Sequence, residues 1–179
     1  MRVLVTGGTG FIGCHSVAAL IERGHEVRLL VRNPQKIRGA LSPLGIDAVD
    51  QVVGDVLDPG SIRRAMDGCD AVVHAAGMYS DDQRRAPELH AMNVVATEHV
   101  LTQAIRAGLD PIVYFSSMIV VFPPVGSMLR AEDPVREPRS AYPRSKAAAE
   151  RIVRELQAQG APIVSIYPGN VQGPLDPTV

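Results

Sequence analysis

Tyr142 and Lys146 stand four residues apart in the run SAYPRSKAAAE, which covers residues 140–150. This spacing places both side chains on one face of a helix. An unperturbed tyrosine titrates near pH ~10, and a neighbouring ammonium favours the phenolate and lowers that pKa. We therefore expect Tyr142 to act as a general acid or base that Lys146 activates. A solvated lysine that merely follows a tyrosine is the alternative.

The lysine content of the chain supports the catalytic interpretation. Lys36 and Lys146 are the only lysines among 18 basic residues, so a solvated cation at position 146 would more often be arginine. A compact ammonium with a tunable pKa suits the catalytic role better than a guanidinium. Ser117, with Ser116 as the alternative, is expected to hydrogen-bond the substrate oxygen and hold it against the tyrosine.

A second motif that could do chemistry lies at the start of the chain. Val3, Leu4 and Val5 predict a buried strand, and four glycines follow within residues 7–13. Apolar residues at helical spacing come next, so the glycines lie between a strand and a helix N-terminus. Backbone N–H groups there, together with the helix dipole, attract phosphate. A glycine-rich turn that binds nothing is the alternative.

The elements that must position these motifs alternate along the chain. Strands are expected over residues 25–33, 51–55, 70–77, 111–117 and 161–170, and helices over 59–66, 88–107 and from 140 onward. Residues 39–47 show no clear period and stay unassigned, and residues 118–139 are expected to form a loop over the site. This rhythm predicts an α/β fold, a Rossmann-type doubly wound parallel β-sheet with helices on both faces. Ligands then gather at the carboxyl ends of the strands.

Several segments resemble one known family in order and spacing. TGGTGFIG at residues 6–13, GD at 54–55, HAAG at 74–77, NVVAT at 93–97, FSS at 115–117, YPRSKAAAE at 142–150 and YPGNVQGP at 167–174 carry the resemblance. They resemble the extended short-chain dehydrogenase/reductase family of the epimerase/dehydratase type, and are most similar to its dihydroflavonol reductase and 3β-hydroxysteroid dehydrogenase members. The resemblance covers essentially the whole chain.

This resemblance implies a catalytic triad and a set of cofactor-binding residues. Ser117, Tyr142 and Lys146 match the triad, and Lys146 would also hold the nicotinamide ribose. The other residues implied to bind the dinucleotide are Gly7, Gly8, Thr9, Gly10, Phe11, Ile12, Gly13, Arg32, Asp55, Val56, Ala75, Ala76, Gly77, Asn93, Ser116, Tyr167, Pro168 and Gly169. Asn93 would either make a structural hydrogen bond near the site or simply be tolerated in its helix. Tyr167 stands where the family often has arginine.

The end of the second predicted strand bears on which dinucleotide binds. In dinucleotide-binding folds an acidic residue at this point bonds the ribose hydroxyls, whereas an arginine accommodates a 2′-phosphate. This chain has Val31 and Arg32 there, with Lys36 and Arg38 nearby. We therefore expect NADP to be preferred and NAD to be possible. Solvated charges beside a turn are the alternative.

Composition bounds the other functions. The formal net charge of −1 gives no field that would gather nucleic acid, and the five histidines show no metal-ligand spacing, so we expect no bound metal. Cys14 and Cys69 belong to no C-x-x-C pair and should be reduced. No long apolar run or leader is seen, so we expect a cytoplasmic protein without a membrane span.

The expected function is an NAD(P)-dependent oxidoreductase that moves a hydride between nicotinamide and a carbonyl or secondary alcohol of a small-molecule substrate. A nucleotide-sugar epimerase or dehydratase with bound NAD, and a redox sensor without turnover, are the alternatives. The resemblance implies that residues 1–179 form the NAD(P)-binding Rossmann domain of a longer enzyme, with most of the substrate domain absent. It also implies a homodimer formed through residues 88–107 and 140–159.

Overall fold

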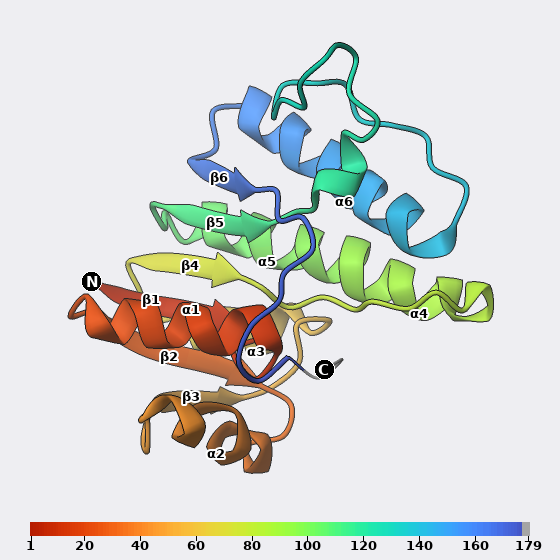
Figure 1. Ribbon diagram of the computed structural model, residues 1–179. Helices are drawn as coiled ribbons and strands as arrows, with labels where there is room; N and C mark the ends of the chain where they lie inside the picture. Colours follow the sequence, from red (N-terminus) through yellow and green to blue (C-terminus); the bar gives the residue numbers. More distant parts are fainter. Residues whose placement is uncertain (177–179) are drawn as a thin grey trace.

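The computed structural model describes residues 1–176 and shows one parallel sheet between two layers of helices (Figure 1). The strands lie in the order β3-β2-β1-β4-β5-β6, and every neighbouring pair is parallel. The strands are β1 (Arg2–Thr6), β2 (Glu26–Val31), β3 (Asp50–Val53), β4 (Ala71–His74), β5 (Ile112–Phe115) and β6 (Ile163–Ile166). This confirms the predicted doubly wound sheet. The chain reverses its direction of travel across the sheet between β1 and β4.

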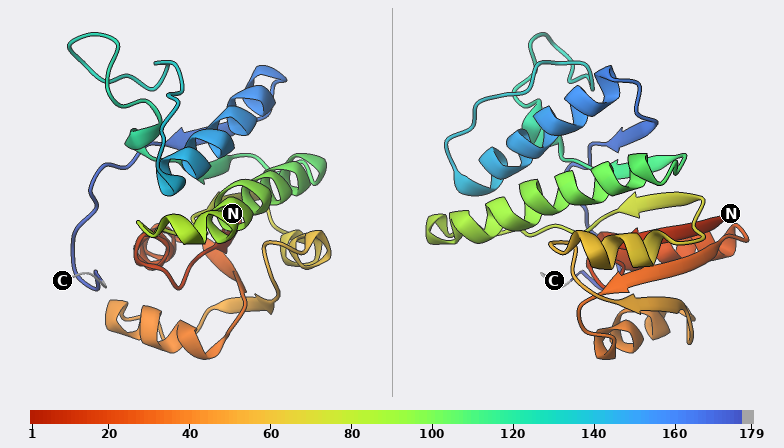
Figure 2. Two further views of the ribbon diagram at one scale, coloured as in Figure 1. Left: turned by 90° about the vertical axis from the view of Figure 1, so that its right-hand side faces the viewer. Right: turned by 180° about the vertical axis from the view of Figure 1, so that it is seen from behind.

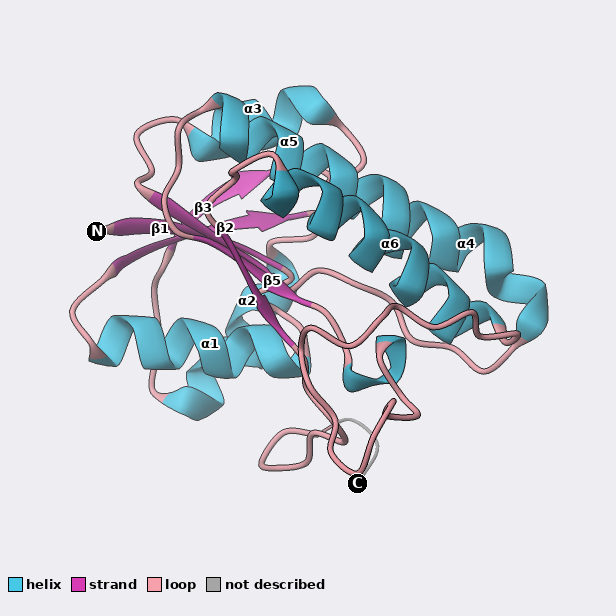
Figure 3. Ribbon diagram, turned by 90° about the horizontal axis from the view of Figure 1, so that it is seen from above, coloured by secondary structure: helices cyan, strands magenta, loops and turns pink. Residues whose placement is uncertain are grey.

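The helices lie on both faces of the sheet, as Figures 2 and 3 show from other sides. The α-helices are α1 (Phe11–Glu22), α2 (Gln35–Leu41), α3 (Pro59–Met66), α4 (Ala86–His90), α5 (Ala96–Arg106) and α6 (Ala141–Ala158). Shorter turns are η1 (Ser42–Leu44), η2 (Gln83–Arg85), the π-helical η3 (Ala91–Val95) and η4 (Met118–Val120). Figure 3 shows α1 on one face and α3, α5 and α6 on the other.

Two apolar cores hold the layers together, one on each face of the sheet. Val5 and Leu29 pack with Val17 of α1, whereas Leu4 and Val72 pack with α3, α5 and α6. Successive residues of one strand thus enter opposite cores, which explains why β1 and β4 are apolar without alternation.

Two segments differ from the sequence-based expectation. The unassigned stretch 39–47 contains the end of α2 and all of η1. Leu41, the last residue of α2, is fully buried against α1 and the sheet. Pro43 and two glycines mask this helix in the sequence because they break its periodicity. The single helix expected over 88–107 is divided by η3, where the backbone adopts one π-helical turn.

Segment 118–139 forms η4 and then an irregular loop, as predicted. Arginines of α6 hold this loop in place. Arg154 donates to the carbonyls of Asp133 and Ala131, and Arg151 donates to the carbonyl of Arg136. The loop is thus fixed to the helix that carries Tyr142 and Lys146.

Candidate dinucleotide and active site

The turn between β1 and α1 is packed so tightly that only glycine fits at its key positions. Gly7 has φ +73°, and a Cβ there would lie 2.5 Å from the backbone nitrogen of Ala76. A Cβ on Gly13 would lie 2.0 Å from the Gly7 carbonyl oxygen, and one on Gly8 would lie 2.6 Å from a Leu29 methyl group. Gly7 and Gly13 therefore let the strand, the turn and the helix approach at backbone distance.

The N-terminus of α1 has the features of an anion site. Within the described residues, Gly10 caps α1 without a side-chain hydrogen bond, and the first turn of α1 holds no acidic side chain. Free N–H groups and the positive end of the helix dipole are left to face a ligand. A dinucleotide diphosphate matches this donor set.

A cavity of about 310 Å³ opens beside this turn at the carboxyl ends of β1, β2, β3 and β4. Its lining residues are Gly7, Thr9, Gly10, Leu30, Val31, Arg32, Lys36, Gly54, Val56, Ala75, Ala76, Gly77 and Met92. Eight residues predicted to bind the dinucleotide are among them. The lining has two cations, Arg32 and Lys36, and no carboxylate. Arg38 does not line the cavity.

Other predicted cofactor residues support this cavity without lining it. The Asp55 carboxylate accepts a hydrogen bond from the backbone N–H of Leu57 and so shapes the turn after β3. Phe11 and Ile12 form the first turn of α1 and line a separate cavity of about 410 Å³, together with residues 171–174. His15 in the same cavity bonds the Pro174 carbonyl at 2.8 Å.

A chain of buried polar side chains fixes the end of β4 against β1. The buried His74 ring bonds the Thr6 hydroxyl at 2.7 Å and the Thr97 hydroxyl at 3.1 Å. Burial, and secondarily the Lys146 charge, lowers the pKa of His74 from 6.5 to about 3, so the ring is neutral at physiological pH. The small residues Ala75 to Gly77 are thereby held beside the glycine turn.

Asn93 joins three parts of the site from the π-helical turn η3. Its amide bonds both backbone groups of Met78, at 2.8 and 2.9 Å, and donates to the Ser145 hydroxyl at 2.9 Å. Ser145 in turn donates to the carbonyl of Tyr142. Of the two expectations for Asn93, the structure favours a structural hydrogen bond near the active site.

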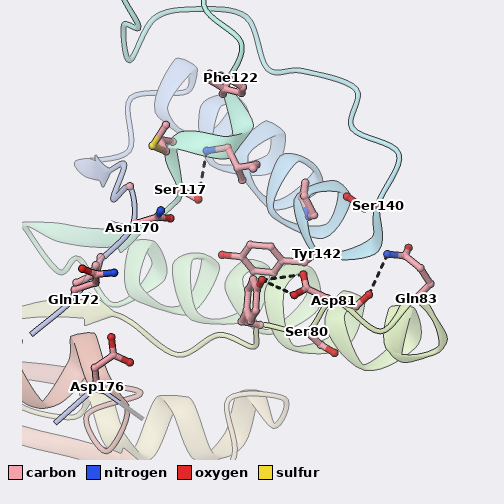
Figure 4. A pocket seen from close by; sticks show the side chains of 16 residues that line it. Ser80, Asp81, Gln83, Ser117, Phe122, Ser140, Tyr142, Asn170, Gln172 and Asp176 are labelled. Atoms are coloured by element: carbon pink, nitrogen blue, oxygen red, sulfur yellow. Dashed lines mark hydrogen bonds between the residues drawn. The ribbon is translucent and has the colours of Figure 1, made fainter. Parts of the chain in front are cut away.

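A larger cavity of about 670 Å³ lies at the carboxyl ends of β5 and β6, where Ser117 and Tyr142 point into the same space (Figure 4). The lining residues are Tyr79, Ser80, Asp81, Gln83, Ser117, Met118, Ile119, Phe122, Ser140, Tyr142, Pro143, Gly169, Asn170, Val171, Gln172 and Asp176. We call this cavity the reaction pocket. None of these lining residues is lysine or arginine.

Lys146 lies behind the reaction pocket rather than in it. The side chain is 7% exposed, and its ammonium donates to the Phe115 carbonyl at 2.8 Å and to the Tyr114 hydroxyl at 3.1 Å. Burial lowers the pKa of Lys146 from 10.5 to about 8, and the nearby Glu150 carboxylate opposes that shift.

The expected acidification of Tyr142 by Lys146 is not seen in this structure. Burial raises the pKa of Tyr142, and the neighbouring Ser117 hydroxyl partly opposes that rise. The ammonium is engaged with Tyr114 and Phe115, a contact that the i to i+4 spacing could not reveal. Ser117 is thus the group that stabilises the phenolate form in this structure.

Ser116, Tyr167 and Pro168 were predicted to contact the cofactor, and none of them lines either ligand cavity. The Ser116 and Tyr167 hydroxyls both donate to the buried Glu150 carboxylate, each at 2.6 Å. The Pro168 carbonyl accepts from the backbone N–H of Met118, whereas Gly169 next to it lines the reaction pocket. Ser117 rather than Ser116 is therefore placed to meet a substrate.

Some residues of the reaction pocket were missed from sequence. The exposed Tyr79 ring packs edge-on against the Tyr142 ring, with centroids 4.8 Å apart. Its hydroxyl donates to the Asp81 carboxylate at 2.8 Å. The Gln83 side chain accepts from the backbone N–H of Ala141 at the start of α6. These residues belong to no recurring motif, so only the fold brings them to Tyr142.

Three sequence-based expectations concern disulfides, metal sites and membrane spans. Cys14 and Cys69 are both free thiols. Within residues 1–176, no group of three or more histidine, cysteine, aspartate or glutamate side chains could hold a metal ion. Among the helices of the same residues, none has the length and apolar character to cross a bilayer.

Comparison with known proteins places the chain in a family. The model of the NAD dependent epimerase/dehydratase family matches residues 3–179, so the chain belongs to this family. A putative dihydroflavonol 4-reductase from Synechocystis is 36% identical, with 96% of this chain and 50% of the relative covered. Mouse 3 beta-hydroxysteroid dehydrogenase type 7 is 33% identical, with 90% and 47% covered. The chain spans about half the length of these relatives.

Solved structures agree with this placement. UDP-glucose 4-epimerase from Thermus thermophilus in complex with NAD is 32% identical, with a TM-score of 0.81 and coverage of 99% of this chain and 58% of that one. The Bordetella bronchiseptica enzyme WbmG in complex with NAD and UDP is 30% identical, with a TM-score of 0.80 and 97% and 55% coverage. The Rossmann-type fold and its relation to NAD-binding proteins are thus established.

Proposed function

We propose that this chain forms the dinucleotide-binding and catalytic half of an NAD(P)-dependent reductase or dehydrogenase. The observation that carries the proposal is the position of Ser117 and Tyr142. Both line one pocket at the carboxyl ends of the strands, and the glycine turn, whose donors suit a diphosphate, lies at the same edge of the sheet. The nicotinamide would supply or accept the hydride at the substrate carbon.

The residues of the chain would divide the remaining work. The Ser117 hydroxyl would bind the substrate oxygen and orient it, and the Tyr142 hydroxyl would donate the proton in reduction or accept it in oxidation. Lys146 would hold the nicotinamide ribose and supply positive charge behind the pocket. Its pKa of about 8 keeps most of the ammonium charged near pH 7.

The lining of the reaction pocket favours an uncharged carbonyl substrate. A nucleotide-sugar carries a diphosphate, which needs cations or helix N-termini for binding. The described lining has Asp81 and Asp176 but neither lysine nor arginine. Relatives named as a reductase and a dehydrogenase support the same class.

An epimerase or dehydratase with permanently bound NAD is the second candidate, because the UDP-glucose 4-epimerase and WbmG structures hold NAD. The two candidates differ in what the purified protein releases on denaturation. A reductase of the proposed kind exchanges its dinucleotide and should release little, whereas the second candidate should release NAD in near-equal amount to protein.

For the cofactor, we propose a preference for NADP over NAD. Arg32 and Lys36 line the cavity at the end of β2, and no carboxylate is there to bond a free ribose 2′-hydroxyl.

For assembly, we propose a homodimer formed through α5 and α6, which lie side by side on one face (Figure 3). Sedimentation equilibrium, which measures the mass of the assembly, tests the homodimer proposal directly.

The substitution Tyr142→Phe tests the enzymatic proposal. Removing the hydroxyl should lower turnover of a carbonyl substrate by about 10²- to 10⁴-fold, the usual range for lost general acid–base catalysis. The Kd for NADPH, measured by fluorescence, should stay within about twofold, because Tyr142 does not line the cavity beside the glycine turn, where we propose that the adenosine part binds and which we call the adenosine cavity. Turnover that survives this substitution would contradict the catalytic role and favour a dinucleotide sensor.

A further inference from the structure

Glu150 is a buried carboxylate at the centre of the reaction half of the molecule. The residue is 0% exposed and lies on α6 one turn after Lys146. It accepts hydrogen bonds from Ser116 Oγ at 2.6 Å, Tyr167 Oη at 2.6 Å and Arg154 Nε at 2.9 Å. A charge so deeply buried is costly unless it is fully bonded, so these donors fix its position.

The partners of Glu150 come from elements that build the reaction pocket. Ser116 stands between Phe115, whose carbonyl binds the Lys146 ammonium, and Ser117, which lines the pocket. Tyr167 follows β6 and precedes Pro168 and Gly169. Two backbone bonds, Ser116 N–H to Ile166 and Met118 N–H to Pro168, join the same strand ends. Glu150 thus joins α6 to the ends of β5 and β6.

The charge of Glu150 also acts on Lys146. The titratable groups around the ammonium are neutral His74 of β4, Tyr114 of β5 and Tyr142 of α6, while Arg154 and Tyr167 bond the Glu150 carboxylate. The Glu150 carboxylate raises the pKa of Lys146 and so opposes the effect of burial.

We propose that Glu150 is a positioning residue of the active site. Through Ser116 it holds the Phe115 carbonyl and the Ser117 hydroxyl in register with Lys146 and Tyr142, and its negative charge, which forms an ion pair with Arg154 at 2.9 Å, lies one helical turn from Lys146. This proposal rests on the proposed function, because it assigns Glu150 a role only if Ser117, Tyr142 and Lys146 carry the reaction.

The test compares Glu150→Gln with Glu155→Gln, which makes the same chemical change at an exposed position of the same helix. The Kd for NADPH is measured by fluorescence over a range of pH. In the unmodified protein, affinity should fall as pH rises through about 8, where Lys146 loses its proton. Glu150→Gln should move that midpoint about one unit lower, as expected when an opposite charge is removed. Glu155→Gln should leave it unchanged.

A midpoint in Glu150→Gln that coincides with that of the unmodified protein would overturn the proposal. If Glu150→Gln does not fold, Ser116→Ala and Tyr167→Phe keep the carboxylate and each remove one of its donors. Each should lower kcat by about tenfold, the effect of an oriented contact of about 1.4 kcal/mol, without moving the pH midpoint. Parental kcat in both variants would overturn the proposal. Failure of the unmodified protein to bind NADPH or NADH would instead contradict the proposed function itself.

Discussion

Arg32 and Arg38 form a natural pair for testing cofactor preference. Arg32 lines the adenosine cavity, whereas Arg38 lies on α2 and does not. Arg32→Ala should weaken NADPH binding by about tenfold, since a guanidinium–phosphate contact is worth roughly 1.5 kcal/mol or more. NADH binding should change by less than about twofold.

Fluorescence titration with both dinucleotides measures this effect, and Arg38→Ala serves as the control that should affect neither. Equal weakening of NADPH and NADH in Arg32→Ala would show that the arginine contacts something other than a 2′-phosphate.

Lys146 makes a second residue-scale prediction, on stability as a function of pH. Its pKa is about 8 in the folded protein against an ordinary value of 10.5, so the unfolded chain binds more protons between these values. Burying the charged lysine lowers the free energy of unfolding below pH 8. This free energy therefore rises as the pH increases through that window. Relative to Lys146→Met, the unmodified protein should gain at most about 1.4 kcal/mol per pH unit.

Urea unfolding of both proteins across this window measures the difference and cancels the other titrating groups. A difference in unfolding free energy that stays flat with pH would mean that Lys146 keeps its ordinary pKa when folded.

From the sequence, the role of a single residue could be proposed only where the residue belongs to a recurring motif. Ser117, Tyr142 and the glycines could be located because their types and spacing recur in one family. The hydrogen bond from Lys146 to Tyr114 could not be predicted in this way, nor could the hydrogen bonds from Ser116 and Tyr167 to Glu150. These contacts join residues 17 to 34 positions apart, and no local pattern specifies which buried donor meets which acceptor.

At the scale of elements, the turn between β1 and α1 allows a matched test of two glycines. Gly7 has a positive φ, and a Cβ there would meet backbone atoms of residues 75 and 76. Gly7→Ala should therefore cost about 3 kcal/mol or more, from strain and displaced backbone together. It should also abolish dinucleotide binding, because relief of the clash separates the turn from β4.

Gly39 provides the control within α2. A Cβ there meets nothing within 4 Å, and its φ is not in the positive range. Gly39→Ala should stabilise the protein by about 0.5 to 1 kcal/mol, since alanine favours the helix. Thermal and urea unfolding of the two variants should shift in opposite directions, and a shared direction would contradict this account of the turn.

Most of the sheet was predictable because buried parallel strands are continuous apolar runs bounded by turn residues. The elements that escaped prediction are those set by tertiary contacts. Helix α2 is stabilised chiefly by burial of Leu41. The π-helical turn η3 lets Asn93 bond Met78 and Ser145 at once, and helical periodicity contains no sign of such a turn.

At the scale of the whole molecule, the two cavities lie on different halves of the sheet. The adenosine cavity is built by β1 to β4, and the reaction pocket by the segments that follow β4, β5 and β6. A dinucleotide bound as we propose would bridge both halves, whereas an adenosine fragment would reach only one. Either ligand should stabilise the folded protein by RT ln(1 + [L]/Kd), which is about 2.7 kcal/mol at a free ligand concentration one hundred times its Kd, and should raise the Tm accordingly.

Thermal-shift assays with NADPH and with adenosine nucleotides that carry or lack a 2′-phosphate measure this effect. Tyr142→Phe should leave the shift from the adenosine nucleotides unchanged. A variant that lost that shift would show that the two cavities are coupled.

The reversal of the chain between β1 and β4 has an evolutionary consequence. In the proposed function, the segments that bind the nucleotide precede those that contact the substrate, so mutation can remodel one set while the other keeps its shape. During evolution, a protein of this fold can therefore acquire a new substrate while it keeps its existing dinucleotide site.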